Sequence, residues 1–302
     1  MPTPEWALPL LALFLTQLAV TMPMMTAVSL LAQRIRNAGV VDLFWAGGFV
    51  MLVGVNLFLA PKLWPALLLA EHLASEGSAR ALVINGLLLV ANLRLCLYLL
   101  RRFLKEHPQE DPRYGAFRTA WEQEAAKKQV ADVSGYVQRR FFWIFQLQAL
   151  LMPVAALPVT LATLSPSFAF GFWEYCGLGL FCVGFAGEAL ADAQLRTFKQ
   201  NPEHRGLTCQ QGLWRYSRHP NYFFEWLMWV SYAVFSLAAP GGWLGLLSPL
   251  LMLHFLLNVT GIAATEARAV ESRKDYREYQ QTTSAFVPWF RRKAPLPGES
   301  AR

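Results

Sequence analysis

The feature that most limits the fold is a series of long apolar stretches with few charged residues. A helix needs about 20 predominantly apolar residues to cross the hydrocarbon core of a bilayer. Seven stretches approach that length: roughly 8–31, 40–60, 81–100, 141–163, 168–191, 222–239 and 242–264. Only 16% of the residues are charged, against about 25% in a typical soluble domain. The sequence therefore predicts an all-α, polytopic integral membrane protein with seven transmembrane helices.

The distribution of Lys and Arg indicates the orientation of these helices. With seven spans, 24 of the 27 basic residues fall on the side that holds the C-terminus. Lys62 and Arg80 fall on the other side, and Arg94 lies inside the third span. Because short cytosolic loops are enriched in Lys and Arg, we expect the N-terminus outside and the C-terminus in the cytosol. The net charge of +7 then faces anionic lipid headgroups or an anionic cytosolic cofactor.

Other patterns narrow the class of protein. The four cysteines show no CxxC or Cys/His metal spacing, so we expect neither a structural disulfide nor a metal site. The sequence has no glycine-rich dinucleotide fingerprint after a strand pattern and no P-loop motif, so a bound nucleotide would not be held by either fold. We expect contact with membrane lipids, but neither nucleic acid nor an obligate protein partner. The expected location is a bacterial inner membrane, or the endoplasmic reticulum membrane in a eukaryote.

We predict a single membrane domain over residues 1–292, followed by a flexible tail over 293–302 that is rich in Pro, Gly and charge. On the outer side, the connection 62–80 contains an apolar run too short to span, and we expect it to lie in the interface.

The longer connections lie on the predicted cytosolic side. One contains a predicted amphipathic helix around 120–130. Another contains Asn201-Pro202 and Gly206, which favour turns.

Polar residues gather at the predicted cytosolic ends of the spans. They are Asp42, Arg94, Tyr98, Glu188, Asp192, Asn221, Glu225, Glu266, Arg268 and Glu271. Several are four residues apart and therefore share a helix face. Single pairs, such as Arg94 with Asp42, could be interhelical salt bridges, whereas the whole set favours a hydrophilic cavity that opens to the cytosol. Neutral amides elsewhere in the spans, including Asn56, Asn85 and Gln146, are expected to form hydrogen bonds between helices.

The segment 212–226 combines cations with the start of an apolar run. A helix that begins here directs free backbone N–H groups and its positive dipole end at an anion, and Arg215, Arg218 and His219 add donors suited to phosphate or carboxylate. The alternative is a positive-inside anchor without a ligand. Asn221 and Glu225 favour the binding site, because unpaired polar groups just inside a membrane are costly.

On these residues the chain resembles the steroid 5α-reductase family, particularly a bacterial branch described as a domain of unknown function. The resemblance is strongest in three motifs: Glu188-x-x-x-Asp192-x-Gln194-Leu195-x-x-Phe198-Lys199, then Gly212-Leu-Trp-Arg-Tyr-Ser-Arg-His-Pro-Asn-Tyr222 with Glu225, then Glu271 through Tyr276-x-x-Tyr279 to Val287-Pro288-Trp289-Phe290. Weaker matches occur around Asp42 and at Arg94-x-x-x-Tyr98. Sterol C14-reductases, which use NADPH, and isoprenylcysteine carboxyl methyltransferases, which use S-adenosylmethionine, carry similar patterns.

The resemblance implies a seven-helix bundle that binds NADPH mainly through residues 188–290. Together with the basic cluster it gives the predicted cofactor residues: Glu188, Asp192, Arg196, Lys199, Arg215, Arg218, His219, Asn221, Tyr222, Glu225, Arg268 and Tyr279. The predicted catalytic residues are Tyr98, which matches the tyrosine that binds the substrate carbonyl, and Asp42 as its acidic partner. The expected reaction is reduction of the C4–C5 double bond of a 3-oxo-Δ4-steroid or a similar lipid-soluble enone. The alternative is methylation of a lipid or prenylated substrate with S-adenosylmethionine.

Overall fold

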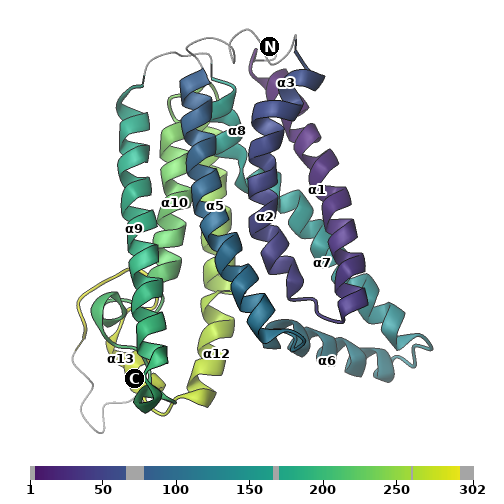
Figure 1. Ribbon diagram of the computed structural model, residues 1–302, viewed down its shortest axis with the longest axis vertical. Helices are drawn as coiled ribbons and strands as arrows, with labels where there is room; N and C mark the ends of the chain where they lie inside the picture. Colours follow the sequence, from purple (N-terminus) through teal and green to yellow (C-terminus); the bar gives the residue numbers. More distant parts are fainter. Residues whose placement is uncertain (1–3, 66–77, 166–169, 260, 293–302) are drawn as a thin grey trace. The chain divides into compact units, whose positions relative to one another are not determined.

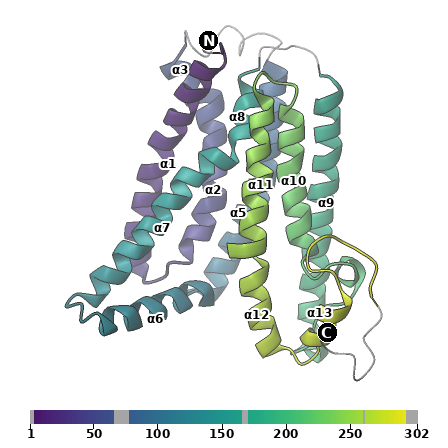
Figure 2. The same cartoon turned by 180° about the vertical axis from the view of Figure 1, so that it is seen from behind.

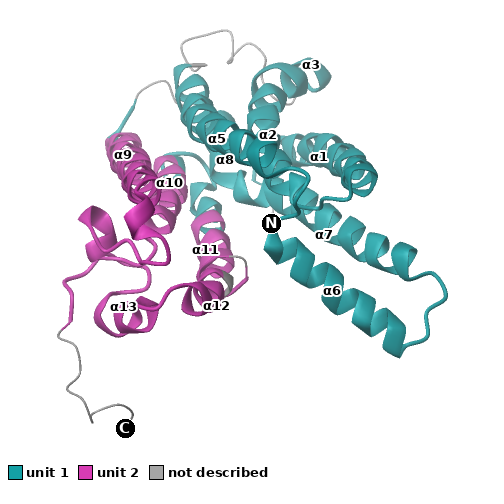
Figure 3. Cartoon of the chain, turned by 60° about the horizontal axis from the view of Figure 1, so that its bottom comes forward, with its two compact units in different colours: residues 1–171, 236–247 teal, residues 172–235, 248–302 magenta. Residues whose placement is uncertain are grey.

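The computed structural model describes residues 4–65, 78–165, 170–259 and 261–292, and every regular element in these ranges is a helix (Figures 1 and 2). The chain divides into two compact units (Figure 3). Unit 1 comprises 1–171 and 236–247, and unit 2 comprises 172–235 and 248–302. Residues 1–292, which we predict as one domain, thus contain parts of both units. The predicted tail and most of the predicted interface segment fall outside the described residues.

Within the described ranges, five helices are long and apolar enough to cross a membrane. They are Ala7–Ile35, Val40–Leu63, Ala79–Glu106, Phe172–Gln200 and Gly242–Val259. The remaining predicted span between residues 222 and 239 corresponds to α10, Pro220–Ser236, which has only 17 residues. The chain therefore has the helices of a membrane protein, while the count of seven spans and their orientation stay predictions.

The fourth predicted span is a bent pair of helices rather than one straight helix. Its two parts, Val133–Ala155 and Leu157–Thr163, differ in direction by 42° and count together as a sixth possible span. Pro158 lies in the first turn of the second helix. Proline has no N–H for the helical hydrogen-bond ladder and clashes with the preceding turn, which explains the break at this point.

Unit 1 contains the following elements: α1 (Ala7–Ile35), α2 (Val40–Gly54), the π-helical turn η1 (Val55–Leu59), α3 (Ala60–Leu63), α5 (Ser78–Glu106), α6 (Pro112–Lys127), α7 (Val133–Ala155), α8 (Leu157–Thr163) and the 3₁₀ turn η4 (Gly242–Leu246). Helix α2 packs along α5, and α1 packs along α7. Helix α6 lies across the lower end of this unit (Figure 1). The predicted amphipathic helix is part of α6, which begins earlier than expected because Asp111 caps it by accepting the Arg113 N–H.

Polar side chains deep in unit 1 bond to one another. Gln17 Nε2 donates to Asn56 Oδ1 at 2.8 Å and to Thr160 Oγ1 at 2.9 Å. Asn56 Nδ2 donates to Asn85 Oδ1 at 2.9 Å, and Asn85 Nδ2 donates to Thr163 Oγ1 at 2.7 Å. All five residues are buried. The network joins α1, η1, α5 and α8, which confirms the interpretation of Asn56 and Asn85 as hydrogen-bonding links between helices.

The remaining elements belong to unit 2, apart from the last residue of α10 and the first residue of α11: α9 (Phe172–Gln200), η2 (Pro202–His204), η3 (Gly212–Arg215), α10 (Pro220–Ser236), α11 (Leu247–His254), the π-helical turn η5 (Phe255–Val259), α12 (Ile262–Ser272) and α13 (Tyr276–Thr282). Glycines allow α9 and α10 to approach closely, since a Cβ on Gly177 would lie 2.7 Å from Phe235 Cβ. The predicted turns are confirmed: the Asn201 side chain caps η2, and Gly206 adopts a φ of 76°.

Candidate cofactor site

The cytosolic end that we predict for α9 displays four predicted cofactor residues on one face. Glu188, Asp192, Arg196 and Lys199 follow one another at intervals of three or four residues, the spacing of neighbours along a helix surface. Glu188 is buried, Asp192 is half-buried, and the two cations are exposed. This face therefore leads from a buried carboxylate to exposed positive charge within about three turns.

Asn221 stands next to this face, in the first turn of α10. Pro220 opens the helix, a position where its missing N–H costs nothing. Asn221 Nδ2 lies 3.4 Å from Asp192 Oδ1. Asn221 Oδ1 is buried and accepts no hydrogen bond from any residue in the described ranges. Because a buried acceptor without a donor costs about 1–3 kcal/mol, this oxygen is suited to an N–H supplied by a ligand.

Arg218 uses nearly all of its donors inside the protein. Its Nε and Nη2 donate to the two carboxylate oxygens of Glu266 at 2.7 and 3.1 Å. Its Nη1 donates to the backbone carbonyls of Gln280 and Thr283 at 2.8 and 2.7 Å. His219 Nε2 lies 3.1 Å from Glu266 Oε1. These bonds fasten the start of α10 to α12, to α13 and to the segment that follows.

We call Arg218, His219 and Glu266 the clamp, and Glu266 is its acidic member. Burial alone would raise its pKa, but hydrogen bonds from His219, Arg218 and Gln280 outweigh burial and lower the pKa from 4.5 to about 2. The carboxylate is therefore ionised at neutral pH and balances the charge of Arg218. The sequence places Glu266 among the polar residues after the last span, but its spacing does not reveal that it pairs with an arginine 48 positions earlier.

Two predicted cofactor residues are aromatic groups packed within the same region. Tyr279 is buried, and its hydroxyl donates to the backbone carbonyls of Trp214 and Ser217. The Tyr222 ring stacks on the His219 ring, with centroids 5.3 Å apart and planes 9° from parallel. Tyr279 therefore ties α13 to η3, and Tyr222 covers the clamp.

The other predicted cations are directed to solvent. The guanidinium groups of Arg196, Arg215 and Arg268 are exposed and form no ion pair with another residue of the described chain. Lys199 is also exposed, so four of the predicted cofactor residues present positive charge that an anionic ligand could reach. The structure thus separates the predicted cations into an exposed group and an internal clamp.

The two predicted catalytic residues belong to unit 1. Tyr98 lies on α5, is 51% exposed, and its hydroxyl forms no hydrogen bond with a described residue. Asp42, at the start of α2, accepts a 2.6 Å hydrogen bond from the Tyr114 hydroxyl at Oδ1 and pairs with the Arg113 guanidinium through Oδ2. Sequence reasoning missed Arg113 and Tyr114 as partners of Asp42, because both follow from the position of α6 rather than from spacing.

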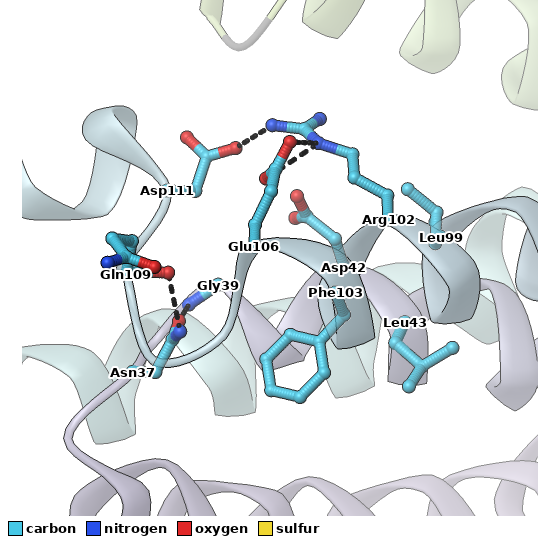
Figure 4. Close-up of a pocket in the computed structure, with 10 residues that line it drawn as sticks. All are labelled: Asn37, Gly39, Asp42, Leu43, Leu99, Arg102, Phe103, Glu106, Gln109 and Asp111. Atoms are coloured by element: carbon cyan, nitrogen blue, oxygen red, sulfur yellow. Dashed lines mark hydrogen bonds and ion pairs between the residues drawn. The ribbon is translucent and has the colours of Figure 1, made fainter.

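A cavity of about 30 Å³ lies beside Asp42 (Figure 4). Its other lining residues are Asn37, Gly39, Leu43, Leu99, Arg102, Phe103, Glu106, Gln109 and Asp111. Arg102 joins Glu106, at 3.1 Å, to Asp111, at 2.8 Å. The volume suits one or two water molecules, whereas pockets for organic ligands measure about 300–1,000 Å³. This cavity is therefore too small for a steroid.

The contacts of Asp42 bear on its predicted role. Each of its carboxylate oxygens accepts a hydrogen bond from a residue of α6, so these contacts fasten α6 to α2. The catalytic role of Asp42 stays a prediction, and these contacts favour a role in positioning α6.

The long apolar helices and the polar residues near their ends define a helical membrane protein with a candidate anion site. The chain matches the family described as a protein of unknown function, DUF1295, over residues 28–283, and it belongs to this family. It is also similar to an uncharacterized protein of Schizosaccharomyces pombe, with 29% identity over 176 residues, which cover 49% of this chain and 48% of the relative. The match thus spans about half the length of that relative. No solved structure matches the chain.

Proposed function

We propose that the chain is an NADPH-dependent reductase that saturates the C4–C5 double bond of a 3-oxo-Δ4-steroid or a similar lipid-soluble enone. Its family is associated with steroid 5α-reductase-like proteins. The observation that carries the proposal is the buried Oδ1 of Asn221, which lies beside Asp192 and close in sequence to exposed cations.

The polar groups around Asn221 fit the nicotinamide end of NADPH. A carboxamide has two N–H donors and one carbonyl acceptor, and the amide of Asn221 offers the complementary groups. Glu225 lies four residues further along α10 on the same face and is half-buried. Its carboxylate is suited to accept a hydrogen bond from a ribose hydroxyl.

The exposed cations fit the phosphate groups. Arg196 and Lys199 continue the α9 face that begins at Asp192, and Arg guanidinium groups bind phosphate through paired hydrogen bonds. Because Arg218 and His219 already contact Glu266, we assign them to the support of the site rather than to direct phosphate binding. S-adenosylmethionine carries a positive sulfur and no phosphate, so the cations favour NADPH over that cofactor.

The chemistry requires a hydride at the β-carbon of the enone and a proton at the α-carbon. NADPH would supply the hydride when bound. Tyr98, by the family resemblance, would donate a hydrogen bond to the carbonyl oxygen as negative charge develops on it. The exposed hydroxyl of Tyr98 has no competing hydrogen bond in the described chain, which is consistent with that role.

NADPH is expected to raise the melting temperature of the detergent-solubilised protein more than NADH does at equal concentration. Only NADPH presents a 2′-phosphate to the exposed cations, and a ligand at about 100 times its Kd adds about 2.7 kcal/mol of stability. Differential scanning fluorimetry with NADPH, NADH and S-adenosylmethionine measures the difference. Equal increases in melting temperature with NADPH and NADH would contradict the proposal that the exposed cations bind the 2′-phosphate. An increase with S-adenosylmethionine alone would favour the methyltransferase.

Asn221→Ala is expected to weaken NADPH binding roughly tenfold or more, because the ligand loses a buried acceptor. The same variant should be nearly as stable as the wild type without ligand, since the acceptor it removes has no donor in the described chain and the Nδ2 contact it removes, to Asp192 Oδ1, is long at 3.4 Å. Gln281→Ala, at an exposed position of α13, is the matched control. Titration by fluorescence quenching and thermal unfolding provide the two readouts. Reduced stability with unchanged NADPH affinity would show that Asn221 is structural.

A further inference from the structure

The residues that follow α13 form an ordered segment outside the apolar spans. Its backbone is held against the segment between η3 and α10: the Arg218 N–H donates to the Ser284 carbonyl at 2.8 Å, and the Trp289 N–H donates to the Tyr216 carbonyl at 2.9 Å. The Phe286 side chain is buried against Leu256 and Ile262. Phe286 is therefore fixed in the interior of unit 2. The residues after it cannot bury their side chains there without breaking the backbone hydrogen bonds to Tyr216 and Arg218.

Large apolar side chains project from this anchored backbone. Val287 is 51% exposed, Trp289 67% and Phe290 76%. The Tyr216 ring is 6.3 Å from the Phe290 ring and is itself 39% exposed. We call these four residues the aromatic surface. Large exposed apolar side chains that lie next to one another mark an interaction surface in a folded protein.

The two segments that carry the aromatic surface are basic. The two paired segments, 205–218 and 279–292, contain five arginines and no acidic residue. Arg218 pairs with Glu266, but Arg205, Arg215, Arg291 and Arg292 are exposed. An occupant of this surface therefore combines apolar groups with negative charge.

We propose that the aromatic surface and its arginines bind anionic phospholipids of the membrane in which the spans lie. Trp side chains concentrate at the level of the headgroups, where an apolar ring and a polar N–H are both accommodated. Exposed arginines near an anionic leaflet are attracted to it, each strengthening association about fivefold. The surface would thus fasten the extramembrane end of unit 2 to the bilayer. This inference does not depend on the proposed reductase activity.

A probe at position 290 tests the proposal. A Phe290→Cys variant, with the four native cysteines replaced by alanine, carries an environment-sensitive fluorophore, and the full chain is reconstituted into phosphatidylcholine vesicles. Quenching is titrated with phosphatidylglycerol or phosphatidylcholine that carries a nitroxide near its headgroup. The matched control is the same label at Gln281→Cys on α13, which is exposed but lies outside the aromatic surface.

We expect nitroxide-labelled lipid to quench the probe at 290 more than the probe at 281. Labelled phosphatidylglycerol should reach the same quenching at a lower mole fraction than labelled phosphatidylcholine. Arg205→Gln with Arg292→Gln should weaken the preference for phosphatidylglycerol by about fivefold for each arginine. Quenching at 290 by aqueous iodide alone would overturn the proposal. So would lipid quenching that appears only after residues 293–302 are deleted, since that result would make the tail the occupant.

Discussion

Tyr98→Phe is expected to lower the rate of enone reduction by on the order of a hundredfold, with NADPH binding unchanged. The substitution removes one hydroxyl that forms no hydrogen bond with a described residue, so the fold loses no internal contact. The loss should appear in kcat, because the hydrogen bond strengthens as charge develops on the substrate oxygen. Progesterone or testosterone reduction by the purified variant measures it.

Two outcomes would contradict this assignment of Tyr98. Full activity would show that another group supports the carbonyl. Loss of NADPH affinity would place the hydroxyl in contact with the cofactor instead. Tyr175→Phe, an exposed tyrosine on α9 without a predicted role, controls for a general effect of removing a hydroxyl.

Arg218→Leu is expected to destabilise the protein by about 3–5 kcal/mol. The variant leaves the Glu266 carboxylate without its bidentate partner and removes the donor to the carbonyls of Gln280 and Thr283. Arg215→Leu is a matched control three residues earlier, because its exposed side chain has no ion pair in the described chain, and its effect on stability should stay within about 0.5 kcal/mol. Unfolding in detergent and proteolysis of the C-terminal segment measure both. Normal stability in Arg218→Leu with lost NADPH binding would instead make Arg218 a phosphate ligand.

The same clamp gives stability a defined pH dependence. The pKa of Glu266 is lowered in the folded protein, so its contribution is fully present above its ordinary pKa of 4.5 and is lost as the pH falls towards about 2. Wild-type unfolding should therefore show a loss of stability in this acidic window. Arg218→Leu should show less of it, because the arginine is one of the groups that lower the pKa.

The sequence predicts the helical membrane class well, because hydrophobic length alone decides it. It also predicts local features with a local cause, such as the Asn201 cap and the turn at Gly206. The bend near Pro158 has a local cause in the proline, but the apolar run continues through it, so hydrophobic length alone does not predict the break. The shortness of α10 is less accessible, since it depends on how the helix ends against its neighbours.

In the candidate site too, features with a local cause can be predicted from the sequence, whereas contacts between distant residues cannot. Helical spacing groups Glu188 and Asp192 on one face, and both lie within the continuous helix α9. Composition cannot separate cations that can reach a ligand from those that hold the fold, because Arg215 and Arg218 have the same chemistry and nearly the same position. Only the distant Glu266 distinguishes them. Asp42 is a similar case, since its partners Arg113 and Tyr114 lie about 70 residues away and meet it only through the placement of α6.

The alternation of the two units along the sequence constrains how the chain can be completed during synthesis. Gly245 of η4 leaves no room for a Cβ beside Pro158, and the Ser236 hydroxyl donates to the Gly242 carbonyl, so this turn is an integral part of unit 1. Unit 1 therefore receives its last element only after residues 172–235 have been translated. Helices α9 and α10 of unit 2 are thus synthesised while unit 1 is still unfinished. A chain whose synthesis stops before residue 247 therefore lacks part of both units.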